Sequence, residues 1–194
     1  MFELYIGGIT TDKDGKVIQR RRRRKAHSFI YGWAWATCAQ LLGEFAPAPV
    51  LGPVYDVNDV AYNIRDCQAT LALTGGLGTT NPGVRVGTGN SPVRVNQTKL
   101  DALIAHGTGV GQMYHQATLW NFVGIDGTQA YFTITRPFVN RSGGQINVRE
   151  AGFHMAVFDL VPTSRYVLAA RDLCSHDVPD GGAVTLTYTV RIVL

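Results

Sequence analysis

The end of the chain alternates between apolar and polar side chains, and this alternation limits the fold more than any other feature of the sequence. Five apolar side chains share one face of an extended strand: Val184, Leu186, Tyr188, Val190 and Ile192. The opposite face carries three threonines and one arginine: Thr185, Thr187, Thr189 and Arg191. Successive side chains of a strand point to opposite faces, so the pattern predicts a half-buried strand.

Other apolar runs are separated by turns that are rich in glycine and proline. Residues 129–140 place Phe132, Ile134 and Phe138 on one face. Further extended runs are predicted at residues 145–149, 153–160 and 166–170. Glycine makes up 22 of the 194 residues and charged residues only 16%, which is typical of a compact chain with many tight turns. We therefore predict a mainly β protein whose residues 50–194 form a β-sandwich or jelly-roll-like domain.

The N-terminal part has a different charge. Residues 2–10 and 16–24 are extended runs on either side of an Asp-Lys-Asp-Gly turn, which predicts a hairpin. Six consecutive basic residues begin within the second run: Arg20, Arg21, Arg22, Arg23, Arg24 and Lys25. Taking these six from the 18 basic residues leaves 12 against 14 acidic residues, a net charge of −2 for the rest of the chain. A strand of consecutive arginines cannot face a core, so we predict an exposed hairpin arm.

The basic run has three interpretations. Arginine binds carboxylates through a planar fork, which favours docking onto an acidic protein neighbour. Consecutive arginines also neutralise phosphates, which favours contact with nucleic acid. A solvated, self-repelling segment is the third interpretation.

A short α-helix is predicted over residues 28–42, with Ser28 as its N-cap and its end near Gly43. Its apolar side chains follow a broadly helical spacing and include Phe29, Ile30, Trp33 and Leu41. A helix with so few polar residues must be covered by its own sheet or by a neighbour. We predict that these side chains dock between subunits, so that residues 1–49 form an N-terminal arm and helix.

No sequence pattern predicts a catalytic residue, a metal site or a cofactor. The glycines of residues 107–111 lack the spacing of a dinucleotide fingerprint and predict a turn. No two histidines stand two or four residues apart, the spacing that would build a metal site. Cys174, His176 and Asp177 are predicted to lie on a surface loop. Tyr114 and Trp120 are interpreted as core residues, with stacking on a sugar ring as the alternative.

Short motifs are spread over most of the chain. They are GVRVGTG at residues 83–89, IAHGTGVGQMY at 104–114, RPFVNRSG at 136–143, VREAG at 148–152, RD at 171–172 and GAVTLTYTV at 182–190. The basic run followed by Ser28 and Phe29 is a further motif. Together these segments resemble a group of small structural proteins of tailed bacteriophages.

The resemblance implies a virion protein without enzymatic activity. We therefore expect a structural component of a tailed-phage virion, attached at the tail or neck as a symmetric oligomer and assembled in the host cytoplasm. The alternatives are a capsid decoration protein and a carbohydrate-binding host-recognition module on the particle. Expected partners are copies of the chain and other virion proteins, with packaged DNA as a second contact of the basic arm. No membrane association is expected.

Overall fold

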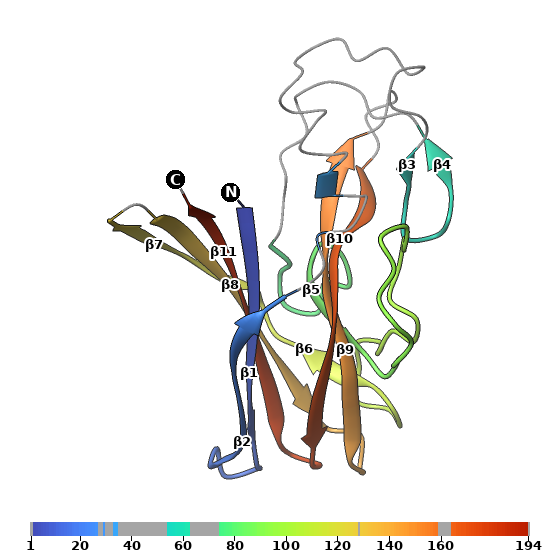
Figure 1. The fold of residues 1–194 in the computed structure, drawn as a ribbon. Coiled ribbons are helices and arrows are strands. Elements are labelled where there is room, and N and C mark those ends of the chain that lie inside the picture. The colour runs from blue at the N-terminus through green and yellow to red at the C-terminus, as the bar shows by residue number, and fades with distance from the viewer. Residues whose placement is uncertain are drawn as a thin grey trace.

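The computed structural model describes residues 2–26, 29, 33–34, 54–62, 74–127, 129–158 and 164–193. Within these residues the chain is mainly β, as the sequence predicts (Figure 1). Its strands are β1 (Phe2–Thr11), β2 (Val17–Lys25), β3 (Val54–Tyr55), β4 (Ala61–Tyr62), β5 (Gly83–Gly87), β6 (Met113–His115), β7 (Leu119–Asp126), β8 (Gln129–Asn140), β9 (Ile146–Phe158), β10 (Ser164–Val178) and β11 (Ala183–Val193).

The larger sheet is antiparallel and has the strand order β2-β1-β11-β8-β6, with β7 paired to the other end of β8. The C-terminal strand β11 lies in its centre, between β1 and β8. Val184, Leu186, Tyr188 and Val190 are fully buried, whereas Ile192 at the end of the strand is 38% exposed. The prediction of a half-buried terminal strand is therefore confirmed.

The smaller sheet has the order β10-β9-β5 and is also antiparallel. Residues 146–149 and 153–158 of the two predicted runs belong to one continuous strand, β9. Strand β10 extends far beyond the predicted run and includes Cys174, His176 and Asp177. The prediction of a surface loop for these three residues is wrong. His176 and Asp177 pair with Val148 and Asn147 of β9, and Cys174 lies in a bulge between two paired stretches of β10.

One core joins the two sheets. Buried side chains from both form a single hydrophobic cluster that includes Leu4 of β1, Val148 of β9 and Tyr188 of β11. Two antiparallel sheets that share a core in this way are consistent with a β-sandwich. Beyond it, Leu100 and Leu168 make a second small contact between the 88–105 segment and β10.

The predicted N-terminal hairpin forms, and its turn has the expected chemistry. Asp12 Oδ1 accepts hydrogen bonds from the backbone N–H groups of Asp14 and Lys16, at 3.0 and 2.9 Å, and Gly15 has a φ of 80°. However, β1 is an internal strand of the larger sheet, with Leu4 and Ile6 in the core. The hairpin is thus part of the sheet, and its projection as an arm is not confirmed. The predicted boundary between residues 49 and 50 lies outside the described residues.

The predicted helix over residues 28–42 also lies largely outside the described residues, and so do Ile30 and Leu41. Phe29 and Trp33 stack on each other with ring centroids 4.7 Å apart, and Trp33 meets Phe153 edge-on at 6.3 Å. Both side chains are partly buried against the core of their own chain. In the described part of the chain, no helix has the length and apolar character needed to cross a bilayer.

Candidate functional site

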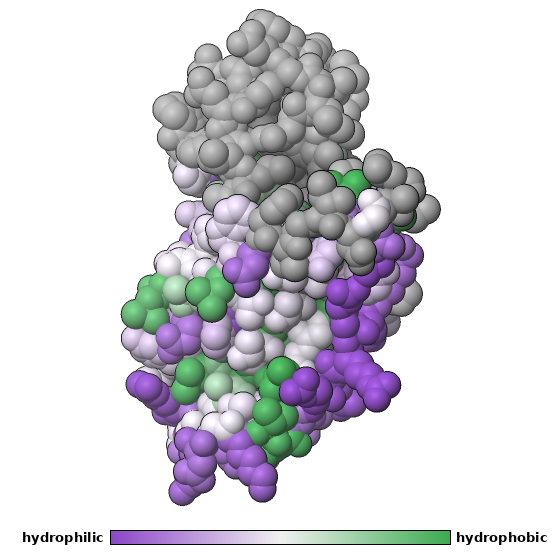
Figure 2. Space-filling view, turned by 90° about the vertical axis from the view of Figure 1, so that its left-hand side faces the viewer, coloured by the Kyte–Doolittle hydropathy of each residue, from purple (hydrophilic) through white to green (hydrophobic). Residues whose placement is uncertain are grey.

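The basic run forms the outer edge of the larger sheet. Strand β2 pairs with β1 on one side and ends the strand order on the other. All six residues from Arg20 to Lys25 are exposed. Figure 2 shows the side of the molecule on which this sheet lies, with hydrophilic residues gathered along the right-hand side of the view. The prediction that the run is exposed is therefore confirmed.

A register shift in β2 divides the run between two directions. Arg21 and Arg24 are paired with Gly8 and Ile6, whose positions in β1 face the core. Arg20 is paired with the partly exposed Ile9, on the opposite face of the sheet. Residues three apart in a regular strand would point to opposite faces, so the register shift between Ile6 and Gly8 lets Arg21 and Arg24 point the same way.

These two inward arginines bridge the two sheets. Arg21 Nε donates to the backbone carbonyl of Ser175 at 3.1 Å, and Arg24 Nη2 donates to that of Leu173. Both carbonyls belong to β10, the edge strand of the smaller sheet, where a strand has an unpaired side. Part of the basic run is therefore used inside the molecule to hold neighbouring sheet edges together.

A cavity of about 400 Å³ lies between β2, β1 and β10. Three arginines and a histidine line it together with small and apolar residues: Ile6, Gly7, Gly8, Arg21, Arg22, Arg24, Leu173, Cys174, Ser175 and His176. Among the described residues, this lining includes no carboxylate. The arrangement favours an anionic ligand, since guanidinium groups bind oxyanions in paired hydrogen bonds.

The other polar groups of this cavity are neutral. Burial lowers the pKa of His176 to about 4, with a further contribution from the nearby Arg21 charge, and its Nδ1 lies 3.0 Å from Thr10 Oγ1. Burial raises the pKa of the Cys174 thiol to about 12, which keeps it protonated. At neutral pH the charge of the cavity therefore comes from its arginines.

Arg20, Arg23 and Lys25 lie on the other face of the sheet, beside positions of β1 that do not face the core. Lys25 Nζ forms an ion pair with Glu3 at 2.9 Å, which holds the pKa of the Glu3 carboxyl below its usual value. The Arg23 guanidinium lies 4.7 Å from the centre of the Tyr5 ring. Among the described residues, none of the arginines from Arg20 to Arg24 forms an ion pair with a carboxylate.

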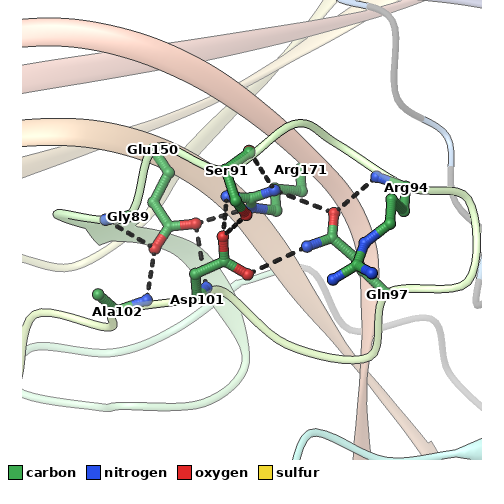
Figure 3. Close-up of polar contacts among 8 residues, drawn as sticks. All are labelled: Gly89, Ser91, Arg94, Gln97, Asp101, Ala102, Glu150 and Arg171. Atoms are coloured by element: carbon green, nitrogen blue, oxygen red, sulfur yellow. Dashed lines mark hydrogen bonds and ion pairs between the residues drawn. The ribbon is translucent and has the colours of Figure 1, made fainter.

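A second polar cluster joins β9 and β10 of the smaller sheet to the 88–102 segment (Figure 3). Arg171 Nε donates to Glu150 Oε2 at 2.7 Å, and its Nη2 forms an ion pair with Asp101 Oδ2 at 2.7 Å. Arg171 Nη1 donates to the Ser91 carbonyl and to Gln97 Oε1, at 3.1 and 3.0 Å. The Arg171 and Glu150 side chains are fully buried, so this network fixes the 88–102 segment onto the sheet.

Glu150 also explains two of the three glycines of the GVRVGTG motif. Its Oε1 accepts from the N–H groups of Gly89 and Ala102, at 3.2 and 2.8 Å. A Cβ atom at Gly87 or Gly89 would collide with this oxygen, so only glycine fits there. This cluster was not predicted from the sequence. The signal that could have indicated it is that the VREAG and RD motifs, which contain Glu150 and Arg171, occur in the same chain as the glycine-rich GVRVGTG motif.

Two further arginines, Arg136 and Arg85, are buried. Arg136 donates four hydrogen bonds to backbone carbonyls, those of Gln116, Val84, Gly76 and Thr79. Arg85 is 1% exposed and donates to Asn81 Oδ1 at 3.4 Å. Burial lowers the pKa of each guanidinium to about 10, which leaves both charged at neutral pH.

Buried histidines lie near these charges and are neutral. Burial lowers the pKa of His115 and of His154 to about 3, with a further contribution from the Arg85 charge. The described residues contain no group of three or more histidine, cysteine and acidic side chains that could hold a metal ion.

The two aromatic residues considered for sugar stacking lie in different settings. Trp120 on β7 is 60% exposed and Leu119 beside it 59%, so the interpretation of Trp120 as a core residue is wrong. Among the described strands, β7 pairs only with β8, at the margin of the larger sheet. Tyr114 is half-buried, with His106 on one side and the Arg141 guanidinium 5.3 Å from its ring centre.

Of the residues predicted to dock, the structure brings the basic run to one sheet edge and places Phe29 and Trp33 on the core of their own chain. The cavity beneath the run was not predicted, because it depends on the register shift and on the distant strand β10. Comparison of the chain with models of known families, with curated proteins and with solved structures found no match.

Proposed function

We propose that this chain is a non-enzymatic structural component of a tailed-phage virion, attached at the tail or neck as a symmetric oligomer. The observation that carries the proposal is the basic edge strand β2. Five consecutive arginines stand exposed there without a carboxylate partner among the described residues. The resemblance of the sequence motifs to small phage structural proteins supplies the class of assembly.

So many like charges repel one another unless an acidic group lies nearby. An exposed charged edge also prevents two copies from pairing through β2, because arginines would face arginines. The edge is therefore suited to a different, acidic neighbour. Contacts between copies would use another surface, for which the exposed Leu119 and Trp120 on β7 are the best apolar candidates.

Two alternatives keep a specific basis. A capsid decoration protein would use the same basic edge on an acidic capsid surface. A carbohydrate-binding module is supported by the exposure of Trp120, since aromatic rings stack on sugars. A jelly-roll-like form of the sandwich would suit either alternative. Binding of a labelled glycan that is lost in Trp120→Ala, with normal particle assembly, would favour the carbohydrate-binding module.

The test is incorporation into particles. Arg20 to Arg24 are replaced together by serine, and particles assembled with this variant are purified and analysed by mass spectrometry. We expect a folded chain that is absent from the particles. Normal incorporation at physiological salt would contradict docking through β2. Loss only from DNA-filled particles, with normal incorporation into empty ones, would instead indicate contact with packaged DNA.

A further inference from the structure

We propose that the cavity between β2 and β10 binds a carboxylate carried on an aliphatic side chain, in practice a glutamate of the neighbouring protein. This inference deepens the proposed function and rests on it for the identity of the protein that supplies the glutamate. The cavity itself stands on its own geometry: about 400 Å³, bordered by three arginines and by the apolar Ile6, Leu173 and Cys174.

The arginines of the cavity are held in place with donors to spare. Arg21 uses its Nε on Ser175, and its two terminal nitrogens make no hydrogen bond with the described residues. Arg24 uses Nη2 on Leu173, and Arg22 makes no such contact. Carbonyl contacts that fix a guanidinium before the ligand arrives reduce the entropy cost of binding. The guanidinium groups of Arg21 and Arg24 are therefore held on one face of β2 with free donors for an oxyanion.

The shape of the cavity depends on glycine. A Cβ atom at Gly8 would lie 2.6 Å from His176 Nε2 and 2.9 Å from a methyl group of Leu186. Gly8 thus allows the His176 ring to lie directly against β1. Any larger residue would displace this ring, which lines the cavity. His176 is neutral and Cys174 protonated, so among the described residues of the lining only the arginines carry charge.

The apolar part of the lining favours a carboxylate over a phosphate. A glutamate side chain has methylene groups that can cover Ile6 and Leu173 while its oxygens meet the guanidinium groups. An inorganic phosphate or a nucleic-acid phosphate presents oxygens in several directions and has no apolar stem to bury. The lining therefore favours an acidic protein segment, and tighter binding of phosphate is one of the outcomes that the test distinguishes.

The experiment is an NMR titration of the full chain at physiological salt, which also detects weak binding. The probe is a short glycine-serine peptide with a central Glu-Leu-Glu, and the matched probe has Gln-Leu-Gln. We expect the glutamate peptide to shift the Nε–Hε signals of Arg21 and Arg24, and the glutamine peptide to bind about tenfold more weakly, as expected for loss of a charge-assisted hydrogen bond.

Variants then separate the cavity from general attraction to a basic strand. Arg24→Gln removes one cavity arginine, and Arg20→Gln removes the same charge from the opposite face of the same strand. We expect about tenfold weaker binding for Arg24→Gln and less than about a twofold change for Arg20→Gln. Arg24→Lys keeps the charge without the planar fork, and should lie between the wild type and Arg24→Gln. Circular dichroism checks that each variant is folded.

Three results would overturn the inference. They are equal loss for Arg20→Gln and Arg24→Gln, absence of shifts with the glutamate peptide, and tighter binding of inorganic phosphate or a short single-stranded DNA than of the peptide. The proposed function fails separately. If the chain binds the peptide but is absent from wild-type particles, the cavity proposal holds and the virion role fails. If the chain is found in particles but binds no peptide, the virion role holds and the cavity proposal fails.

Discussion

Arginine occurs in two opposite settings in this protein. Arg85, Arg136 and Arg171 are almost completely buried, and Arg136 and Arg171 take hydrogen-bond acceptors from several segments of the chain. The arginines of β2 are exposed and keep most of their donors free. The difference follows from desolvation. A guanidinium removed from water needs fixed acceptors, whereas one at a sheet edge is solvated and remains available to a partner.

The two settings also differ in their partners. Arg171 has carboxylates, and Arg136 has only backbone carbonyls, which it takes from four separate positions. The buried arginines therefore tie loops to strands, and their loss should destabilise the fold. The exposed run holds one pair of sheet edges, so its loss should chiefly change binding.

The largest expected effect comes from Arg171→Met. This change leaves the buried Glu150 and the partly buried Asp101 without their cation, which costs about 3–5 kcal/mol in the free energy of unfolding. Urea denaturation measures it. The matched control is Arg149→Met, which removes a partly exposed pair with Asp177 and should cost no more than about 1 kcal/mol. Equal losses in the two variants would remove the distinction between buried and exposed arginine pairs.

The exposed run could be predicted from the sequence and the buried arginines could not, for a physical reason. Six consecutive cations exclude a core position whatever the fold, so the local sequence decides. A single arginine between apolar residues, as in Val84-Arg85-Val86, is compatible with an outward side chain in any strand. The hydrogen bond of Arg85 goes to Asn81, outside its strand, and the partners of Arg171 come from segments 21 to 80 residues away.

The same reasoning explains the errors in the strands and in Trp120. Alternation predicted β8 and β11 because one face of each is covered by the core. Strand β10 is buried from Val167 to Asp172 on both faces, so its sequence does not alternate and its length was underestimated. Trp120 is exposed on β7, which pairs with β8 at the margin of the sheet, and this marginal position depends on the strand order and not on the local sequence.

A smaller effect is expected from the histidines beside the buried arginines. His154 is neutral in the folded protein because burial lowers its pKa to about 3, against about 6.5 in the unfolded chain. The unfolded state thus binds more protons between these values, so the stability is fully present above pH 6.5 and is lost as the pH falls toward 3. At pH 4.5 the loss from this one group is about 2–3 kcal/mol.

The measurement is the free energy of unfolding of the wild type and His154→Gln at pH 7 and pH 4.5. Glutamine does not titrate, so the variant should lose about 2–3 kcal/mol less than the wild type over this interval. The buried Arg85 remains charged at both pH values and adds no pH dependence of its own. Parallel pH profiles for the two proteins would show that His154 binds its proton equally well in both states.

The smallest expected effect lies within the exposed run and tests its division into inward and outward arginines. Arg24→Gln loses the hydrogen bond to the Leu173 carbonyl that joins β2 to β10, which should cost about 0.5–1.5 kcal/mol in thermal or urea unfolding. Arg20→Gln changes the same charge on the other face and should stay within about 0.5 kcal/mol of the wild type. Because both variants relieve repulsion within the run to a similar degree, their difference isolates the contact with β10. If Arg20→Gln destabilised the fold as much as Arg24→Gln, the run would act as one uniform charged surface. The contrast between anchored and free arginines would then hold only between the core and β2, and not within the strand.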